Sequence, residues 1–316
     1  MSKEKEPKSP LIIEPGKGYV PQFFIPTPSI LINKEIQNGG VPSGSIFQFQ
    51  SEGEGSFKST MALQMLGYAQ KMGLKTAYVD GEGNLINIDA GDGLFNPWLD
   101  NLGVDPNLIY FVEPGPGEDI WEAVIDLVEN HGVQFVVMDS IHSIRPGHSY
   151  ETEVGDNAIG QHAKLHQQGI LKILPLLRKH HAILCGINQR RDNVTQQGKM
   201  GTNPSGGASW RFYSRFTFIN KRPSKSKIEG KEFIPLEVYI DKSRGGTAFK
   251  TIETFARQGY GIDRRAELAV MAEEQKLIKK SGAWWKTADG ETIGQGEDAR
   301  FAWAEVNEEL ILGITT

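Results

Sequence analysis

Short apolar segments alternate with longer helix-forming segments through the middle of the chain, between residues 29 and about 262. The apolar runs are Ile46–Gln50, Thr76–Asp80, Ile109–Val112, Phe135–Asp139 and Ala182–Asn188, and the helical segments are Ser59–Lys71, Glu118–Glu129 and Gly160–Lys179. This alternation is typical of βαβ units around a mostly parallel sheet. Because the strands are almost continuously apolar, we expect helices on both faces of the sheet. The predicted fold class is therefore α/β.

Three later apolar runs differ, because no helical segment separates them. They are Phe212–Asn220, Leu236–Ile240 and Phe249–Phe255. We expect them to extend one edge of the sheet as antiparallel strands. Pro175 lies inside the third helical segment and is expected to bend or break that helix, since proline cannot donate a backbone hydrogen bond.

The two ends of the chain differ from this middle region. Residues 1 to about 28 contain six prolines, which predicts an extended arm rather than a helix. The apolar patch Phe23–Ile25 is a candidate docking point, and a disordered tail is the alternative. Residues 263–316 predict a small α+β C-terminal lobe. Its expected elements are a helix at Glu267–Lys280, a hairpin turn at Asp289-Gly290 and a final helix at Glu297–Leu310.

Composition narrows the class of protein. The 316 residues include one cysteine, Cys185, which excludes an internal disulfide and a cysteine-based metal cluster. A formal net charge of −5 excludes a uniformly basic nucleic-acid binder but allows a local basic surface. The start lacks the apolar core of a signal peptide, and no apolar run reaches the roughly 18 residues of a membrane span. These features predict a reduced, cytoplasmic setting with no membrane partner.

A glycine-rich loop follows the strand Ile46–Gln50 and precedes a helix. Its sequence is Gly53-Glu54-Gly55-Ser56-Phe57-Lys58-Ser59-Thr60. In a phosphate-binding loop, backbone amides cradle the phosphates, the lysine reaches the β and γ oxygens, and the hydroxyl binds Mg²⁺. The strict G-x-x-x-x-G-K-[ST] spacing fails twice, at Glu52 and at Phe57. Two interpretations stay open: a nucleotide site, or an ordinary glycine loop in which Ser59 caps the helix.

Two carboxylates follow other predicted strands. Asp139 ends the run Phe135–Asp139, and Glu82 comes just after Thr76–Asp80. Since ligands of open α/β sheets bind at the carboxyl ends of the strands, both side chains are placed to converge with Lys58. Asp139 is suited to hold a magnesium ion, and Glu82 to orient and deprotonate a water molecule. Taken singly, each carboxylate is equally compatible with a helix cap or a solvated turn.

Positive charge is concentrated between residues 190 and 227, which hold nine lysines and arginines and one acidic residue, Asp192. The first part, Arg190–Gly207, is rich in Gly, Asn, Gln and Thr. That composition is typical of a mobile loop that orders on a nucleic-acid backbone, and a disordered basic loop is the alternative. Nearby, His162 and His166 have the spacing of a helical metal pair, but without an acidic third ligand they predict a solvated or DNA-facing pair.

Short blocks in this order resemble the RecA family of recombinases over roughly residues 29–300. The blocks are Asp80-Gly81-Glu82, Val137-Met138-Asp139-Ser140, Glu153-Val154-Gly155-Asp156, Ile187-Asn188-Gln189, Gly206-Gly207, Lys276-Leu277-Ile278, Gly282-Ala283-Trp284-Trp285 and Ile293-Gly294-Gln295-Gly296. The last three are similar to the bacterial C-terminal lobe. Phe57 before the lysine is similar to the T-even phage branch, so the chain is identified as a phage-encoded, RecA/UvsX-type member. The resemblance implies a RecA-like P-loop ATPase core at residues 29–262.

The resemblance implies roles around ATP and Mg²⁺. Lys58 and Ser59 would bind the phosphates and the magnesium ion, Asp139 would complete the magnesium shell, and Glu82 would be the catalytic base. Gln189, expected to end its strand before a flexible loop, would sense the γ-phosphate.

The resemblance also implies a contribution from a neighbouring subunit. Lys242 and Arg244 match a basic pair that reaches the γ-phosphate of a neighbour. Residues at i and i+2 of an extended segment point to the same side, so both cations can face one anion. A solvated turn is the alternative.

Two DNA-binding loops are implied in the same way. The first, Glu153–Gly160, would supply Ile159 and Gly160, with Lys164 just beyond it. The second would supply Arg190, Arg191, Val194, Lys199, Gly206 and Gly207. The isoleucine and the valine would wedge between bases, the cations would meet phosphates, and the glycines would let backbone amides approach the DNA.

The predicted function is an ATP-dependent recombinase that forms a helical filament on single-stranded DNA, pairs it with double-stranded DNA and exchanges strands. Its cofactors would be ATP and Mg²⁺. Its partners would be DNA, further copies of itself, and single-strand-binding or mediator proteins, at the nucleoid or in the cytoplasm of a phage host. Two alternatives stay open: a DNA-binding structural filament with lost or weak ATP hydrolysis, and a related ring-forming ATPase such as a helicase or a regulator.

Two departures from the family limit these expectations. The family's adenine contacts fall in Asn84–Asn101, which looks longer than the family norm, so no adenine contact is assigned. The proline-rich arm cannot be the N-terminal helix with which the bacterial members dock their subunits. We therefore expect Phe23–Ile25 or Phe212 at the subunit interface.

Overall fold

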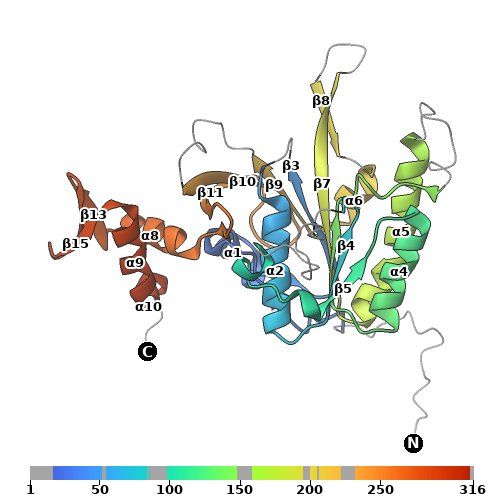
Figure 1. The fold of residues 1–316 in the computed structure, drawn as a ribbon, viewed down its shortest axis with the longest axis horizontal. Coiled ribbons are helices and arrows are strands. Elements are labelled where there is room, and N and C mark those ends of the chain that lie inside the picture. Colours follow the sequence, from blue (N-terminus) through green and yellow to red (C-terminus); the bar gives the residue numbers. More distant parts are fainter. Residues whose placement is uncertain are drawn as a thin grey trace, which may run out of the picture.

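A computed structural model describes residues 17–51, 55–83, 85, 98–147, 159–194, 200–204, 206–221 and 232–313. Its centre is a ten-stranded sheet (Figure 1). Along the sheet the strands follow the order β12-β11-β10-β9-β3-β7-β6-β4-β5, and the tenth strand, β8, pairs with β7 alone. The strands are β3 (Ser45–Ser51), β4 (Thr76–Asp80), β5 (Ile109–Val112), β6 (Phe135–Asp139), β7 (Ile183–Val194), β8 (Met200–Pro204), β9 (Phe216–Lys221), β10 (Phe233–Ser243), β11 (Lys250–Arg257) and β12 (Gly261–Ile262). From β9 to β5 neighbouring strands are parallel, and β10 to β12 extend the sheet in antiparallel order. The predicted fold class is confirmed.

The other elements are shorter or lie outside this sheet. They are β1 (Phe24–Ile25), α1 (Ile30–Glu35), η1 (Gln37–Gly39), β2 (Val41–Pro42), α2 (Lys58–Lys71), α3 (Trp98–Asn101), η2 (Pro106–Leu108), α4 (Gly117–Glu129), α5 (Ile159–Lys179), α6 (Ala208–Tyr213), α8 (Arg264–Glu274), β13 (Ile278–Ser281), β14 (Trp284–Thr287), β15 (Thr292–Gln295), α9 (Gly296–Val306) and α10 (Glu308–Leu312). Within the described ranges, no helix is both long and apolar enough to cross a membrane.

Helices cover both faces of the parallel part of the sheet. Helix α2 packs on one face, and α4 and α5 pack on the other (Figure 1). Side chains of β3 alternate between the two cores: Phe47 and Phe49 lie under α2, whereas Ile46 lies under α4 and α5. Because both faces are covered, a ligand can reach this part of the sheet only at the strand ends.

Most predicted core elements agree with the structure in type and extent. Strands β4, β5 and β6 match residue for residue, and α2 and α4 begin one residue earlier than predicted. The strand predicted at Phe212–Asn220 is wrong at its start, because Phe212 lies in α6 and β9 begins at Phe216. The fully buried Trp210 holds α6 against the sheet, a long-range contact that the apolar pattern does not contain.

Pro175 neither ends nor divides α5, which runs from Ile159 to Lys179. The expectation of a broken helix is wrong. Pro175 and Leu171, whose carbonyl loses its i+4 amide partner, both lie on the exposed side of the helix. Water can therefore bind the carbonyl that the proline leaves without a donor.

The C-terminal lobe differs from its prediction at two helix ends. Helix α8 stops at Glu274, and the expected last turn is strand β13, which pairs with β14. Lys276 has a left-handed backbone (φ 61°), which interrupts the helix. The final helix is divided at Asn307 into α9 and α10. The predicted hairpin turn is confirmed, since Gly290 (φ 92°) joins β14 to β15.

The described part of the N-terminal arm belongs to the body of its own chain. Strand β1 pairs with β2, and Ile25 is fully buried. Thr27 and Ser29 are buried as well, and Ser29 caps α1 through its side chain. Residues 1–16 lie outside the described ranges. The patch at Phe23–Ile25 thus pairs with β2 of its own chain, and its place at a subunit interface stays a prediction.

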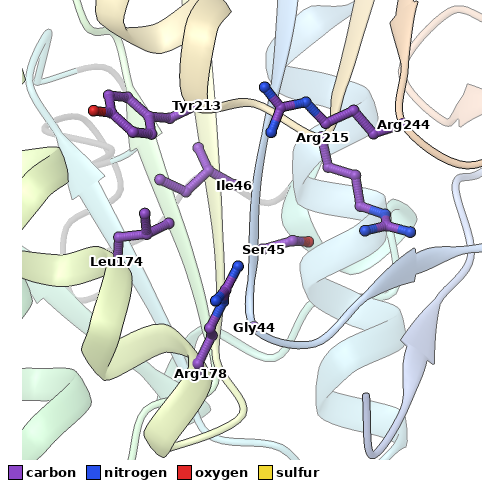
Figure 2. Close-up of a pocket in the computed structure, with 8 residues that line it drawn as sticks. All are labelled: Gly44, Ser45, Ile46, Leu174, Arg178, Tyr213, Arg215 and Arg244. Atoms are coloured by element: carbon purple, nitrogen blue, oxygen red, sulfur yellow. The ribbon is translucent and has the colours of Figure 1, made fainter. Parts of the chain in front are cut away.

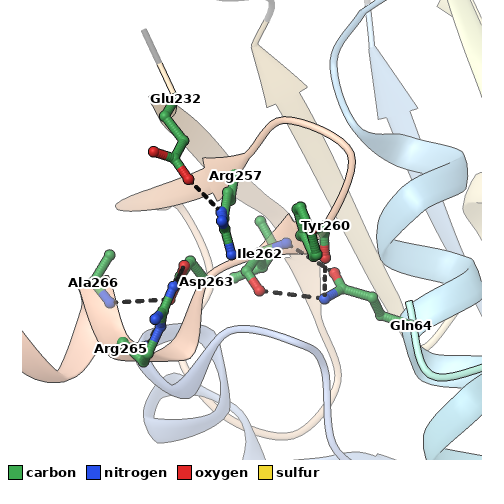
Figure 3. A network of polar contacts seen from close by, with 8 residues as sticks. All are labelled: Gln64, Glu232, Arg257, Tyr260, Ile262, Asp263, Arg265 and Ala266. Atoms are coloured by element: carbon green, nitrogen blue, oxygen red, sulfur yellow. Dashed lines mark hydrogen bonds and ion pairs between the residues drawn. The ribbon is translucent and has the colours of Figure 1, made fainter. Parts of the chain in front are cut away.

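A polar network joins the core to the C-terminal lobe (Figure 3). The Gln64 side chain of α2 donates to the Ile262 carbonyl (3.2 Å) and accepts from the Ile262 amide (2.9 Å). Gly261 leaves room for this contact, since a Cβ there would lie 2.4 Å from Gln64 Oε1. The next residue, Asp263, accepts hydrogen bonds from the Arg265 and Ala266 amides and so starts α8.

Glu267 of α8 makes a second connection, and its side chain is fully buried. Its carboxylate accepts hydrogen bonds from Ser29 Oγ (2.5 Å), the Ile30 amide (2.6 Å) and Thr254 Oγ1 (2.5 Å). Burial raises the pKa of this carboxyl, and the hydrogen bonds from Ser29, Thr254 and Ile30 oppose that rise. One carboxylate thus ties α1, β11 and α8 together.

We expect Glu267→Ala to lower the free energy of unfolding by about 2–4 kcal/mol, because three buried donors lose their acceptor. Glu267→Gln keeps an acceptor for the Ile30 amide and should cost much less. Because the pKa of Glu267 is raised in the folded state, the free energy of unfolding of the wild-type protein should fall as the pH rises through that pKa. The glutamine variant cannot ionise at this position, so it should lose this pH dependence. Urea unfolding followed by tryptophan fluorescence measures both effects. Glu274→Ala, exposed at the end of α8, is the control, and equal stability of the alanine and glutamine variants would contradict the assignment.

Candidate nucleotide site and DNA-facing elements

Three parallel strands, β3, β6 and β4, end at one edge of the sheet, and β7 passes through this edge at Gln189. In their register Ser51 of β3 lies opposite Gln189 of β7, and Asp80 of β4 lies opposite Asp139 of β6. Strand β6 pairs directly with β7, so the four strands are consecutive along this edge. The segments that follow them carry most of the side chains that the sequence analysis selected.

Lys58 begins helix α2 and is almost fully buried at this edge. Its ammonium group donates to Ser51 Oγ (2.5 Å) and Ser56 Oγ (3.1 Å). Phe57 precedes it with a left-handed backbone (φ 60°), a conformation that is uncommon for a bulky residue. The chain thus turns sharply at Phe57, and the Lys58 side chain extends back toward Ser51 and Ser56 at the start of the loop. Gly53 and Glu54 lie outside the described residues.

A residue that the sequence analysis missed anchors this loop. Asn220 of β9 donates from Nδ2 to the Ser56 carbonyl (2.8 Å). Asn220 is fully buried, although the sequence pattern places it only in an apolar strand. Thr60 lies in the first turn of α2, directly after Ser59.

Asp139 and Ser59 come together as predicted. The Asp139 carboxylate accepts hydrogen bonds from the Ser59 side chain and from Tyr78 Oη (2.6 Å). Burial raises the pKa of Asp139, and the two hydrogen bonds counteract this effect. Burial also raises the pKa of Tyr78 well above its ordinary value, so its hydroxyl keeps its proton and remains a donor. A hydroxyl and a carboxylate in contact are hard oxygen ligands of the kind that Mg²⁺ binds, so these residues fit that ion.

Glu82 lies beside this pair, at the exposed surface. Its carboxylate accepts a hydrogen bond from Ser140 Oγ (2.6 Å). The Gly81 amide donates to the Asp139 carbonyl (2.7 Å), and a Cβ on Gly81 would lie 2.2 Å from Ser143 Oγ. Close packing of these two turns therefore holds Glu82 next to Asp139 while its carboxylate stays accessible to water.

Gln189 lies beside the lysine loop, but its strand does not end there. Strand β7 continues to Val194 and pairs with β8, with Arg191 opposite Asn203. The expected flexible loop is therefore, in its described part, a β-hairpin that projects from the sheet (Figure 1). Lys199 and the side chains of Arg191 and Val194 lie outside the described part of the chain.

The two glycines at the base of this hairpin have a packing role that the sequence analysis missed. A Cβ on Gly206 would lie 2.6 Å from Ile141 Cγ2, and one on Gly207 would lie 2.7 Å from Ala163 Cβ. Both glycines also have positive φ. They let the base of the hairpin pack against α5 and against the turn that follows Asp139.

The histidines of α5 belong to the same contact, and the prediction that both face solvent or DNA is wrong for His166. His166 is fully buried, and its Nδ1 accepts from Trp210 Nε1 (3.2 Å). Its Nε2 therefore holds the proton and donates to the Ile141 carbonyl (3.1 Å). Burial, and then His162, lower the pKa of His166 to about 3. Within the described residues, no group of three or more His, Cys, Asp or Glu side chains could hold a metal ion.

The first DNA loop is described only at its end. Ile159 and Gly160 begin α5, where Gly160 and Lys164 are exposed. Residues 153–158 and the Ile159 side chain lie outside the described part. Lys164 is thus exposed, and the residue before it, Ala163, lies against Gly207 at the base of the hairpin.

The structure does not bring Lys242 and Arg244 to Lys58. The Arg244 amide donates to the Arg215 carbonyl (3.0 Å), and the Arg215 amide donates to Ile46 (2.6 Å), near the start of β3. The lysine loop follows the other end of β3, about 16 Å away along the strand.

Within one chain these two cations cap helix α6. Lys242 Nζ donates to the Arg211 (2.6 Å) and Phe212 (2.8 Å) carbonyls, and Arg244 Nη2 donates to Phe212 (2.9 Å). Burial, Arg244 and Arg211 lower the pKa of Lys242 to about 8. Phe212 itself is 64% exposed. In the single chain both cations are therefore bound to a helix end, and their contact with a neighbour's phosphate stays a prediction.

Comparison with known proteins gives one family. The model of the RecA N-terminal domain matches residues 17–263. Protein RecA of Thermotoga petrophila is 32% identical over an alignment of 333 residues, which covers 98% of this chain and 90% of the relative. Protein RecA of Xylella fastidiosa (strain 9a5c) is 30% identical over 290 residues, with 90% and 80% covered, and that of Macrococcus caseolyticus is 31% identical over 287 residues, with 89% and 77% covered.

We expect Tyr78→Phe to raise the pKa of Asp139, because the variant removes a hydroxyl that stabilises the carboxylate. Stability should fall by about 1 kcal/mol. Carbon-13 NMR titration of the Asp139 carboxyl measures the shift directly. Tyr110→Phe, on the neighbouring strand β5, is the control and should leave that titration unchanged. An unchanged Asp139 pKa in Tyr78→Phe would show that the tyrosine does not donate to it.

Proposed function

Because the chain belongs to the RecA family, we propose that it is an ATP-dependent recombinase that forms a helical filament on single-stranded DNA and pairs that strand with a homologous duplex. The observation that carries this proposal is the meeting of a buried lysine, a serine–aspartate pair and an accessible glutamate at one edge of a parallel sheet. These are the residue types that phosphoryl transfer requires.

The proposed roles follow from the contacts. Lys58, now bound by two hydroxyls, would exchange them for phosphate oxygens of ATP. Ser59 and Asp139 would hold Mg²⁺, which neutralises phosphate charge when bound. Glu82 is exposed beside them and would orient and deprotonate the attacking water. Gln189, opposite Ser51 on the next strand, would respond to the γ-phosphate and pass its presence into the hairpin that continues from it.

The remaining charge would come from a neighbouring copy. Lys242 lies level with the middle of β3 and Arg244 near its start, and both side chains are bound to carbonyls of α6, so they do not serve the lysine loop of their own chain as it is folded. A head-to-tail arrangement would bring the amino edge of one sheet to the carboxyl edge of the next. The exposed Phe212 beside these cations supports an interface there. Hydrolysis would then require polymerisation.

DNA binding is proposed for the hairpin and the start of α5. Both lie at one end of the molecule, and their sequences supply the cations and glycines selected above. Contacts with the sugar–phosphate backbone would make binding independent of base sequence. Three further points stay proposals. They are action in the cytoplasm and at the nucleoid, single-strand-binding or mediator proteins as partners, and a phage origin.

One alternative to the recombinase is supported by a separate observation. Phe57 occupies a loop position where glycine is usual, and this favours a structural DNA filament with lost or weak hydrolysis. Measurement of phosphate release with and without single-stranded DNA separates this alternative from the recombinase. Electron microscopy with DNA and a nonhydrolysable nucleotide separates open filaments from closed rings.

We expect Lys58→Ala to abolish nucleotide binding and DNA-stimulated phosphate release, and the double variant Lys242→Ala, Arg244→Ala to lower the rate about a hundredfold while nucleotide binding persists. An equal mixture of the two variants should recover activity, because about one interface in four would combine an intact site with intact cations. Absence of recovery, with mixed filaments visible by microscopy, would contradict catalysis across the interface. Normal turnover by Lys58→Ala would overturn the site itself.

We expect Arg191→Ala to weaken binding of single-stranded DNA equally for all base sequences and to reduce the slope of log affinity against log salt by about 1. Lys172→Ala, which removes a cation from the exposed face of α5 far along the helix, is the matched control. Fluorescence anisotropy of labelled oligonucleotides at several salt concentrations measures both. An unchanged slope in Arg191→Ala would exclude this residue as a phosphate contact.

A further inference from the structure

A pocket of about 100 Å³ opens at the amino edge of the sheet, at the opposite end of β3 from Lys58 (Figure 2). Its base is formed by Ser45 and Ile46, and its side by Leu174 of α5. Arg178 reaches into it from α5, while Arg215 and Arg244 approach from the opposite side (Figure 2). Three cations from three different segments of the chain therefore line one small cavity.

Nothing in the lining neutralises these cations. Among the described residues that line the pocket there is no carboxylate. The carboxylate of the nearby Asp241 is bound to Arg211 (3.2 Å), which is not part of the lining. Like charges placed together at a partly buried site destabilise the fold unless an anion joins them.

Among the three arginines, Arg215 most clearly lacks a group that balances its positive charge. Its side chain makes no hydrogen bond or ion pair with any residue in the described part of the chain, and its Nε is buried away from water. Burial, and then the neighbouring Arg244, lower the pKa of Arg215. The backbone hydrogen bonds of Arg215 with Ile46 and Arg244 fix its main chain beside the start of β3.

The other two arginines have partial structural explanations. Arg178 lies in the last turn of α5, where a cation favours the helix dipole. Arg244 caps α6 through the Phe212 carbonyl. Neither explanation applies to Arg215, which lies in neither helix. Arg215 therefore brings a further positive charge to a cavity whose lining holds no carboxylate, and such a concentration of cations favours an anionic ligand.

We propose that this pocket binds a phosphate group, either free or at the end of a small molecule. The planar guanidinium group donates in a fork that matches the oxygens of phosphate. The cavity has about the volume of three water molecules, which suits one tetrahedral oxyanion and is too small to enclose a nucleotide. The pocket lies at the other end of β3 from the lysine loop of its own chain, and it shares Arg244 with the cations proposed to reach a neighbour's nucleotide.

The test is calorimetric titration of the full chain carrying Lys58→Ala with inorganic phosphate. That background removes the phosphate contact of the proposed nucleotide site, so heat cannot come from there. We expect binding to persist, and Arg215→Ala or Arg178→Ala to weaken it about tenfold or more. Lys179→Ala removes a cation one residue further along α5 and is the matched control. Arg215→Lys keeps the charge and guards against a simple folding defect.

Two of the possible results would overturn the proposed phosphate pocket. Binding by the wild-type chain that disappears in Lys58→Ala alone would place the phosphate at the glycine-rich loop and overturn the pocket. Equal weakening by Lys179→Ala and Arg178→Ala would show nonspecific attraction and overturn it as well. Ribose 5-phosphate in place of inorganic phosphate distinguishes the sources: equal affinity indicates the end of a small molecule, and no affinity indicates the free ion. Sodium chloride at matched ionic strength controls for screening.

Discussion

Coverage of the parallel sheet on both faces is the constraint on which the rest of this structure depends. Phe47 and Phe49 face α2, and Ile46 faces α4 and α5, so the centre of the sheet is closed to water and to ligands. Polar chemistry can then occur only where the strands end. The parallel register brings the carboxyl ends of β3, β6 and β4 to one edge, and the turns after them carry Lys58 and the carboxylates. The candidate site is thus a consequence of how the core is buried.

The two edges of this sheet carry complementary charge. The carboxyl edge holds acidic groups around one lysine, whereas the amino edge holds Lys242, Arg244 and the arginine pocket. In the single chain, peptide carbonyls of α6 accept hydrogen bonds from the two cations. A peptide carbonyl is a weaker partner for a cation than a phosphate, so these side chains can be drawn away when a nucleotide approaches. Under the proposed function, hydrolysis would then depend on contact between copies.

A continuous set of packed and hydrogen-bonded groups links the candidate site to the hairpin. Ser140 bonds Glu82, and the next residue, Ile141, bonds His166 and packs against Gly206 at the base of the hairpin. Trp210 fixes the tautomer of His166 from the other side. Glycines at the base permit close packing, so a movement of the turn after Asp139 would press directly on the hairpin. His166 and Trp210 in this set are fully buried and hydrogen-bonded, which favours a rigid connection at the base of the hairpin.

The local pattern of the chain determined the strands β4, β5 and β6 and the helices α2 and α4, because side-chain periodicity is a property of neighbouring residues. The alternation of strands and helices along the chain also indicated the edge at which Lys58, Ser59 and Asp139 meet. The tertiary structure alone decided the partners of Tyr78, Asn220 and Glu267, since each bond joins segments that no spacing relates. It also decided that α8 ends early and that residues after Gln189 form a hairpin. Pairing with the next strand, β14 for β13 and β8 for β7, supplies hydrogen bonds that a helix or a solvated loop would otherwise provide, and packing against the rest of the molecule decides between them.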